Sequence, residues 1–414
     1  MSTASRPTDT SHPPDYGTAK MGIGFWIVAA AFLVAMAFST IPTPLWSLYR
    51  DRDGLSTAAV TVAFAAYAAG VVISLLLAGH LSDRWGRKRL LLPALALEAV
   101  AGIMFLMRDD FPGLIAARIV TGLAVGIVTP TATAYLMELH GRARPGKPQG
   151  RASMVSTAAN LGGLGLGPLT AGLLAQHVDR PLTLPYLVFL ILLVLAVVGV
   201  AFVPESVALV SGGAYRPQKI TVPRLARSRY FALAGAAAVA FAILGLFTSL
   251  APAFLAMAGQ QGSAAAGVSA FAVFAAAAVA QIFLGRMPAD IQLRIGMIGM
   301  SAGSVVLAGS VAASSASGFI TGGLLAGAGS GVLLRGSLTA AASLAPVHLR
   351  GEALAGVFLC AYLGLAVPIL GLGAATAAGF PLDGSLVTFC GLLLAGLAAV
   401  TTTLRRHPAP TASQ

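Results

Sequence analysis

The sequence predicts an all-α membrane protein, with twelve transmembrane helices arranged as two pseudo-symmetric bundles of six. Three observations support this prediction. The 414 residues are 57% hydrophobic and only 10% charged, the apolar residues fall in long uninterrupted runs, and glycines and prolines recur at matching places in the two halves. A soluble domain of ordinary composition carries about 25% charged residues, so this composition disfavours a soluble fold.

The apolar runs define the predicted spans. About 20 mostly apolar residues cross the hydrocarbon core as a helix, and twelve segments meet that length with short polar breaks between them. They are predicted at about 22–48, 57–79, 90–107, 113–138, 152–176, 184–204, 230–257, 264–285, 293–313, 318–344, 353–378 and 384–404. Little chain is left for an extramembrane domain.

The chain ends are predicted to be polar tails, at residues 1–21 and 405–414. The first tail lacks the basic-then-apolar layout of a cleaved signal peptide, so we expect it to be disordered and followed by an uncleaved helix. Lysines and arginines lie mostly on the side of the two tails, and the opposite side holds only Arg50, Arg52, Arg108 and Arg180. This asymmetry predicts that both termini are cytoplasmic.

The net charge of +12 is interpreted as a topology signal and a contact with anionic lipid headgroups, and nucleic-acid binding is not expected. Arginines outnumber lysines, and alanine and glycine are abundant. This composition favours a bacterial source and hence the bacterial cytoplasmic membrane.

Two similar halves are predicted, at 22–204 and 230–404, joined by a basic linker at 205–229. Pro44 and Gly54 at the end of the first predicted helix recur as Pro252 and Gly262, each 208 residues later. Transporters built from such repeats hold their substrate near the bilayer midplane between the halves and rock one half against the other. A duplicated bundle with a structural or lipid-handling role is the alternative.

The loop between the second and third predicted spans carries a dense motif. It reads Gly79-His80-Leu81-Ser82-Asp83-Arg84-Trp85-Gly86-Arg87-Lys88-Arg89. This segment resembles the loop signature of the major facilitator superfamily, G-x-L-x-D-R-x-G-R-K/R, and matches it at each defining position. The resemblance implies the fold of that superfamily and transport of a small molecule by alternating access. A purely topogenic loop is the simpler alternative.

In the superfamily the aspartate of this loop docks against the start of the eleventh helix, which here begins near residue 350. The resemblance implies a latch that closes the cytoplasmic side in the outward-facing state. Acidic and basic residues that flank other cytoplasmic loops are expected to form ion pairs across the same gate. The predicted latch comprises Gly79, Asp83, Arg84, Gly86, Arg87, Lys88, Glu138, Arg151, Arg350 and Glu352.

The fifth predicted span carries Gly163, Gly167, Pro168 and Gly172. These residues resemble the antiporter motif G-x-x-x-G-P-x-x-G-G, with Ala171 in place of one glycine. The resemblance implies the twelve-helix drug:proton antiporter branch, whose members export substrate in exchange for protons. Pro204-Glu205-Ser206 resembles part of a sugar-porter signature without its basic residue, which argues against sugar uptake.

Three residues are candidates for proton coupling: Asp83, Glu98 and Arg118. Glu98 lies well inside a predicted span, where burial disfavours the charged form of a carboxyl group. Its alternative is a structural hydrogen bond, for example toward Arg118. An arginine inside the membrane costs about 2.5–3.5 kcal/mol on insertion scales, so Arg118 should face a cavity or a partner. A structural role with a snorkelling side chain is equally open for Arg118.

Arg335 is the second arginine inside a predicted span. Helices 1, 4, 7 and 10 line the cavity in the superfamily, and Arg335 falls on helix 10. We expect it to hold an anionic group of the substrate or to neutralise a carboxylate of another helix, and a positive cavity argues against strictly cationic substrates. Mixed aromatic and amide walls suit amphipathic ligands. The other predicted wall residues, each of which could serve ordinary packing instead, are Trp46, Tyr67, Asn160, Phe241, Phe247, Gln281 and Tyr362.

These features predict proton-coupled efflux of a small amphipathic molecule, either a drug or a metabolite. A permease or exporter dedicated to an organic anion, sugar or amino acid is the first alternative. A membrane receptor or lipid-handling protein that moves no solute is the second. Nucleotide-binding loops, zinc spacings and nucleophile triads are absent from the sequence, so we expect no enzyme activity, no cofactor and no metal. A monomer suffices for this architecture.

Overall fold

Twelve helices long and apolar enough to cross a membrane run through the described part of the chain, and that part contains no strand. The predicted all-α membrane fold is therefore confirmed. The structure is a computed structural model, and it describes residues 17–78, 81, 85–108, 110–206, 226–260, 262–346 and 349–407.

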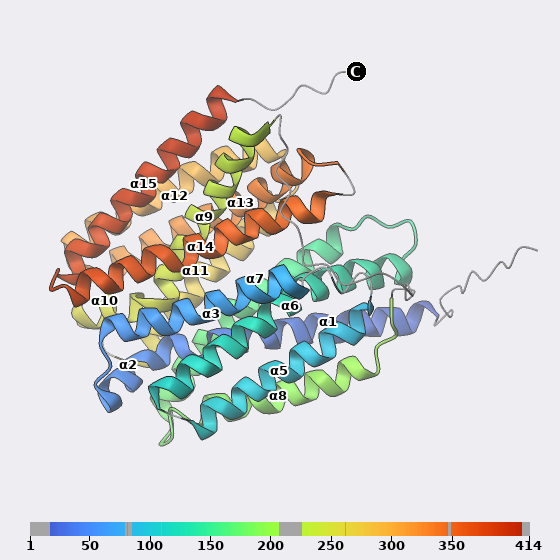
Figure 1. Ribbon diagram of the computed structural model, residues 1–414, viewed down its shortest axis with the longest axis horizontal. Helices are drawn as coiled ribbons and strands as arrows, with labels where there is room; N and C mark the ends of the chain where they lie inside the picture. The colour runs from blue at the N-terminus through green and yellow to red at the C-terminus, as the bar shows by residue number, and fades with distance from the viewer. Residues whose placement is uncertain are drawn as a thin grey trace, which may run out of the picture.

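The first half of the chain contains seven labelled helices (Figure 1). They are α1 (Thr18–Thr40), α2 (Pro42–Asp53), α3 (Thr57–Ala78), α5 (Arg87–Met107), α6 (Phe111–Ala143), α7 (Gly150–His177) and α8 (Leu184–Ala201). The second half contains α9 (Arg227–Ser249), α10 (Ala251–Met257), α11 (Ser263–Leu284), α12 (Ala289–Ala312), α13 (Ala316–Ser343), α14 (Arg350–Ala377) and α15 (Leu382–Arg406).

Ten of the twelve predicted spans coincide with one helix each, and the predicted spans 22–48 and 230–257 each cover two helices, α1 with α2 and α9 with α10. The helix ends differ from prediction by a few residues. The difference has two physical causes. α6 continues to Ala143, beyond the apolar run, because polar residues at a helix end remain helical where they reach water or partners. The predicted span 230–257 is divided between α9 and α10. Pro252 lacks a backbone N–H and is accommodated in the first turn of α10, as Pro42 is in α2.

Each half buries its own apolar core. One core joins buried residues between Met21 and Val203, and the other joins residues between Tyr230 and Val400. Phe64 and Ala68 of α3 and Leu161 of α7 belong to the second core, so these two helices carry the contact between the halves. In Figure 1 the two bundles converge toward the end that carries α2 and α10.

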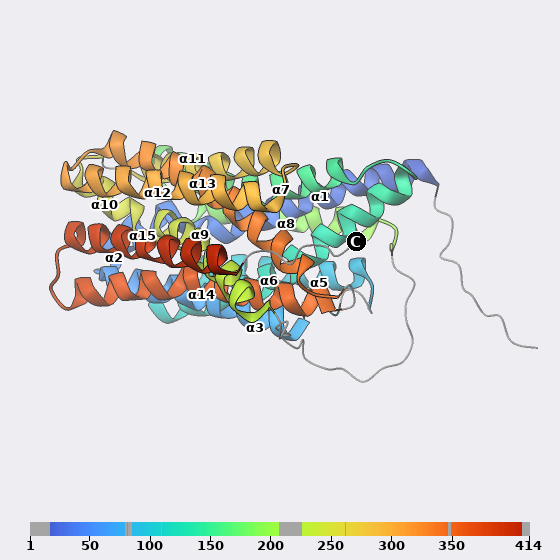
Figure 2. The ribbon, with the colours of Figure 1, turned by 90° about the horizontal axis from the view of Figure 1, so that it is seen from above.

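α7 packs against α11, and α3 packs against α14 (Figure 2). Glycine makes the first of these contacts close. A methyl group at Gly172 would overlap the backbone oxygen of Ser263, and one at Gly267 would overlap the backbone oxygen of Pro168. The two backbones thus meet directly, as small residues allow between membrane helices.

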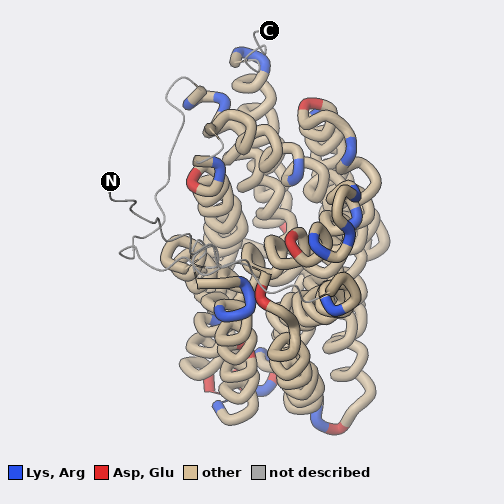
Figure 3. The backbone as a smooth tube through the Cα atoms, turned by 90° about the vertical axis from the view of Figure 1, so that its right-hand side faces the viewer, with Lys and Arg blue, Asp and Glu red and all other residues tan. Residues whose placement is uncertain are grey.

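The opposite end of the bundles carries the basic residues. Figure 3 looks onto this end and shows lysine and arginine positions at helix ends of both bundles. Arg87 starts α5, Arg227 starts α9, and Arg405 and Arg406 finish α15. Lysine and arginine residues are more frequent on the cytoplasmic side of membrane proteins, and the predicted orientation rests on this bias.

Candidate functional site

A cavity of about 490 Å³ lies between the two halves. Its walls come from α1, α2, α3, α6 and α7 of the first half and from α9, α11, α13 and α14 of the second. Along α6 the lining runs from Arg118 to Met137. At 1.5 Å per residue, this stretch spans about 28 Å, most of the thickness of a bilayer core.

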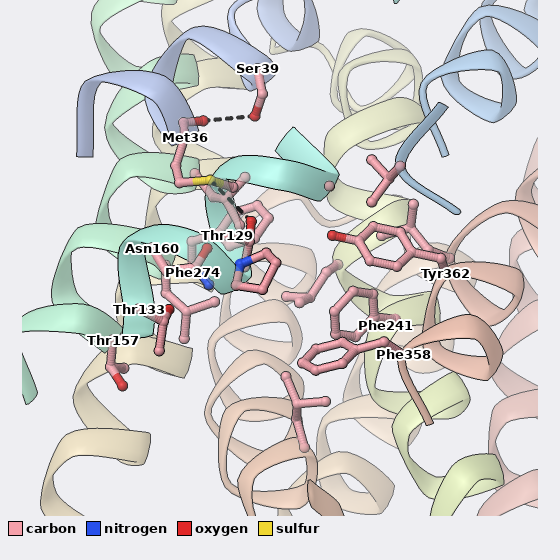
Figure 4. Close-up of a pocket in the computed structure, with 18 of the residues that line it drawn as sticks. Met36, Ser39, Thr129, Thr133, Thr157, Asn160, Phe241, Phe274, Phe358 and Tyr362 are labelled. Carbon is pink, nitrogen blue, oxygen red and sulfur yellow. Dashed lines mark hydrogen bonds between the residues drawn. The ribbon is translucent and has the colours of Figure 1, made fainter. Parts of the chain in front are cut away.

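Aromatic side chains form much of the wall. Phe241 and Tyr362 meet edge to face with ring centroids 5.3 Å apart, and Phe64 and Tyr67 lie 6.4 Å apart. Figure 4 shows Phe241 and Tyr362 with Phe358 on one side of the pocket. Such a surface buries apolar and aromatic parts of a ligand.

Polar uncharged groups line the opposite wall, which is built by α1, α6 and α7. Ser156 donates a hydrogen bond to Thr133 over 3.1 Å, and Thr129 donates to the sulfur of Met36 over 3.7 Å. Asn160 lies beside them in the lining (Figure 4). An amphipathic ligand would therefore meet an aromatic wall on one side and hydroxyl and amide groups on the other.

Two arginines are the charged residues of the described lining, which contains no Asp or Glu. Arg118 is 4% exposed, donates to the backbone oxygen of Ser39 over 2.7 Å, and places its guanidinium carbon 4.3 Å from the centre of the Tyr67 ring. Its Nε has no hydrogen-bond partner among the described residues. Arg118 thus places a positive charge in the buried wall, with one N–H group that no described residue accepts.

Arg335 links the two halves. From α13 it donates to the backbone oxygen of Gly285 over 3.2 Å and to the hydroxyl of Ser153, in α7 of the other half, over 3.3 Å. Ser153 lies close to the start of α7, near the basic end of the bundles. Arg118 and Arg335 therefore lie toward opposite ends of the cavity and give it a positive charge along its length.

Glu98 is completely buried in α5, outside the cavity lining. Neither of its carboxyl oxygens has a hydrogen-bond partner among the described residues. The hydrogen bond to Arg118 that the sequence left open is not present, because Arg118 donates to Ser39 and lies over Tyr67. A buried carboxyl without a partner is costly when charged, and native proteins rarely keep one without a reason.

The motif glycines of α7 face two different neighbours. Gly163 and Gly167 face α1: a methyl group at Gly163 would lie 2.5 Å from the backbone oxygen of Leu33, and one at Gly167 would overlap the backbone oxygen of Ala37. Gly172 faces α11 of the other half. The four predicted motif residues therefore hold α7 tightly between α1 and α11, at the end of the cavity opposite Arg335.

A polar cluster joins α5, α6 and the end of α8 near the basic face. Arg87 and Glu138 form an ion pair of 2.8 Å. The Glu205 carboxylate accepts from the backbone N–H groups of Arg87, at 2.9 Å, and Lys88, at 3.1 Å. This carboxylate satisfies free donors at the start of α5 and complements the positive end of its helix dipole. Gly86 has φ of 99° and leaves room for that carboxylate, which a side chain would strike.

Other predicted latch residues lie elsewhere. Gly79, Asp83 and Arg84 lie outside the described residues. Arg350 and Glu352 stand in the first turn of α14. Glu138 and Arg151 do not pair with each other, because Glu138 is held by Arg87. The guanidinium of Arg151 instead lies 5.6 Å from the centre of the Trp26 ring.

Seven of the predicted cavity and coupling residues line the cavity together: Tyr67, Arg118, Asn160, Phe241, Gln281, Arg335 and Tyr362. Trp46 and Phe247 lie outside the lining, which corrects their predicted position. Trp46 is 2% exposed and packs on Tyr49, and Phe247 is fully buried against Phe319. Both rings face the interior of their own bundle.

Sequence reasoning missed Phe64, Phe274 and Phe358, three aromatic residues of the wall. Helical spacing could have found them. Phe274 precedes Gln281 by seven residues on α11, and Phe358 precedes Tyr362 by four on α14, so each pair shares a helix face. Phe64 likewise precedes Tyr67 by three residues on α3. Extending each predicted wall residue along its helix face would have added all three.

The sequence model of the Major Facilitator Superfamily matches residues 27–368. This chain therefore belongs to that superfamily, whose members are transporters and not enzymes, and it is an integral multi-pass membrane protein. The superfamily that the loop motif resembles is confirmed.

Similar proteins match only parts of the chain. An uncharacterised MFS-type transporter, Rv1250 of Mycobacterium tuberculosis, is 31% identical over 156 residues, which is 36% of this chain and 25% of the relative. The 3-(3-hydroxy-phenyl)propionate transporter of Escherichia coli is 36% identical over 78 residues, 19% of each protein. The quinolone resistance protein NorA of Staphylococcus aureus is 26% identical over 149 residues, 36% of this chain and 37% of NorA. The matches thus cover well under half of each relative.

Solved structures resemble the whole chain. A bacterial homologue of the human lysosomal transporter Spinster, in its inward-facing and occupied conformation, aligns with a TM-score of 0.72. The alignment covers 97% of this chain and all of that one, at 14% identity. A likeness at this identity supports the fold alone.

Proposed function

We propose that this protein is a secondary active transporter that moves a small amphipathic organic anion across the membrane by alternating access. The observation that carries the proposal is the composition of the cavity between the halves. It combines aromatic side chains with two arginines, and its described lining contains no carboxylate. The apolar body of a substrate would pack on the rings, and its acidic group would pair with a guanidinium.

The charge argument favours an anion over a cation. Two unit charges 4 Å apart interact by about 4 kcal/mol at the effective dielectric constant of a protein surface. An anionic substrate gains this attraction at an arginine, whereas a cation loses a comparable amount. The Escherichia coli relative is named for 3-(3-hydroxy-phenyl)propionate, an aromatic carboxylate of this class. A strictly cationic drug spectrum is disfavoured.

The packing between the halves supports an inward-facing state. At the end of the cavity near Gly172 the backbones of α7 and α11 are in direct contact. At the other end, Arg335 donates a hydrogen bond to Ser153 across the cavity lining. We propose that this end faces the cytoplasm of a bacterial cell, as the basic residues indicate. Rocking the halves would then break the α7–α11 contact and close the end near Arg335.

We further propose that transport is export coupled to proton entry, carried out by a monomer. Three features support this direction: the antiporter-like glycines and proline of α7, the unpartnered buried carboxyl of Glu98, and the partial similarity to the quinolone resistance protein NorA. Asp83 stays a second candidate for the coupling residue. Proton-coupled uptake of the same anion is the alternative, favoured by the similarity to the propionate transporter.

The test measures proton movement across the membrane of inverted vesicles that contain the protein. Aromatic carboxylates, amphipathic cations and sugars are added in turn, and lumen pH is followed with a dye. Proton release triggered by the carboxylates supports anion:proton exchange, whereas carboxylate efflux driven by a lumenal acid load supports symport. A response to cations alone contradicts the proposal. Silence across the panel, with equilibrium binding absent as well, contradicts transport of these classes.

Two variants connect the response to the structure. Glu98→Gln removes the buried carboxyl at nearly constant shape. Asp53→Asn is the matched control, because Asp53 is an acid at the end of α2 that pairs with its neighbour Arg52. Coupled proton release is expected to disappear in the first variant and persist in the second. If Glu98→Gln and Asp53→Asn show the same coupled proton release, Glu98 is not part of the coupling mechanism.

A further inference from the structure

A second large groove, of about 980 Å³, lies between α9, α12 and α15 at the basic end of the second bundle. It is separate from the central cavity, with which it shares no lining residue. Figure 1 shows these three helices together at the outer edge of that bundle. Ile298 in its lining is 70% exposed, so the groove faces away from the protein interior toward the membrane.

The groove has a cationic end and an apolar length. Along α12 its lining consists of residues that recur every three or four positions and so share one helix face: Asp290, Leu293, Arg294, Met297, Ile298, Ser301 and Ala302. From Arg294 to Ala302 this face extends for about 12 Å toward the membrane centre. α15 contributes Thr401, Leu404 and Arg405.

Two of the three arginines in the groove are free to bind. Arg229 is committed: it pairs with Asp290 at 3.0 Å and donates to the backbone oxygen of His407, also at 3.0 Å. Arg294 and Arg405 are exposed and have neither an ion pair nor a hydrogen bond within the described chain. The groove therefore carries two uncompensated positive charges beside an apolar surface.

At the corresponding end of the first bundle, acidic groups compensate the basic ones. There the first arginine of α5 is neutralised by Glu138, and the Glu205 carboxylate that follows α8 caps the start of α5. In the second bundle α15 ends with Arg405 and Arg406. Basic residues therefore stand at the end of the last helix of this bundle, whereas the acid Glu205 follows the last helix of the first bundle. Arg294 and Arg405 are therefore open to an anionic group from outside the described chain.

We propose that this groove binds an anionic phospholipid of the leaflet on the side of the chain termini, the cytoplasmic leaflet in the orientation proposed above. The headgroup phosphate lies between Arg294 and Arg405, and one acyl chain follows Met297, Ile298 and Ala302 along α12. Basic pockets between membrane helices at the cytoplasmic side suit such headgroups. A soluble phosphate or sugar phosphate would gain the charge contacts and leave the apolar length empty.

The test compares two lipids that differ in headgroup charge. Fluorescent phosphatidylglycerol and phosphatidylcholine with identical chains are titrated against the full-length protein in nonionic detergent, and the ratio of their dissociation constants is measured. One arginine near an anionic lipid contributes about a five-fold preference. Arg294→Gln with Arg405→Gln should therefore lower the preference for phosphatidylglycerol by roughly 30-fold.

A matched control removes the same charge from the same end of the molecule. Arg227→Gln with Arg286→Gln changes two exposed arginines that lie outside the groove lining. The control should keep the wild-type ratio. An equal loss in both double variants would indicate general electrostatic attraction and overturn the site, as would an unchanged ratio in the Arg294 and Arg405 variant.

The acyl contact is tested separately. Ala302→Phe fills the groove without a change in charge, and it should weaken both lipids while leaving their ratio unchanged. Glycerol phosphate, the headgroup without chains, should fail to displace bound phosphatidylglycerol. Displacement at comparable concentrations would show a soluble-anion site and overturn the lipid proposal. Elution as a single monodisperse peak, as for the wild type, is required of each variant.

Discussion

Replacing Arg335 by glutamine removes one of the two positive charges of the central cavity and keeps a side chain that can donate hydrogen bonds. In the structure Arg335 donates to the Gly285 backbone oxygen and to the Ser153 hydroxyl. Hydrogen bonds to charged groups contribute about 1.5–3 kcal/mol. If the substrate anion pairs with Arg335, the variant should bind it about 10–150-fold more weakly.

The assay is equilibrium binding of an aromatic carboxylate to purified protein, together with its flux in vesicles. Two further variants separate the possible roles of the arginine. Arg335→Lys keeps the charge and should retain most of the affinity for a singly charged anion. Ser153→Ala removes the hydrogen bond between the halves without a change in charge, and it should leave affinity near the wild-type value while altering how readily the halves separate.

Either of two results would refute this reasoning. If Arg335→Gln is folded and binds the carboxylate with unchanged affinity, Arg335 does not contact the substrate anion. If Ser153→Ala reduces affinity as much as Arg335→Gln, the contact between the halves and not the charge determines binding. Either result would return the anion site to Arg118, the other arginine of the lining.

Three other predictions concern the supporting structure. Arg87→Gln should lower the melting temperature, because it leaves Glu138 without its ion-pair partner at a cost of about 1–3 kcal/mol. The double variant Arg87→Gln with Glu138→Gln should recover part of this loss. Thermal unfolding of the single and the double variant tests both expectations. Gly167→Leu should reduce folded yield and transport because its side chain would strike the backbone of α1, whereas Gly162→Leu, with open space around it, should be tolerated in the same flux assay. Glu98→Gln should keep exchange of labelled substrate across vesicles without a proton gradient and lose accumulation driven by one; loss of both activities would indicate a structural role.

The fold was predictable because its main signal is local. A run of about 20 apolar residues must become a helix in lipid, where every backbone polar group needs an internal partner. This rule placed all twelve spans, including the polar-flanked Leu382–Arg406. The predicted bounds missed the break of the first span between α1 and α2 and that of the seventh span between α9 and α10, although Pro42 and Pro252 were the available signals.

The cavity was predictable in part. Arg118 and Arg335 stood out because a charge inside a span needs a cavity or a partner, and both line the cavity. Aromatic residues carry no such signal, since they are equally stable in a bundle interior and in a cavity wall. Trp46 and Phe247 were therefore assigned to the wall, while Phe64, Phe274 and Phe358 were overlooked.

By itself the sequence predicted the twelve apolar helices that are long enough to cross a membrane, and its loop motif indicated the transporter superfamily to which the chain belongs. Each of these follows from composition or from spacing along one segment. Only the tertiary structure decided which charges are compensated. Glu138 pairs with Arg87 and not with Arg151, Glu98 is buried without a partner, and α12 and α15 leave two arginines unpaired beside an apolar groove. Pairing depends on how helices far apart in the chain rotate against one another, and spacing along the sequence does not specify that rotation.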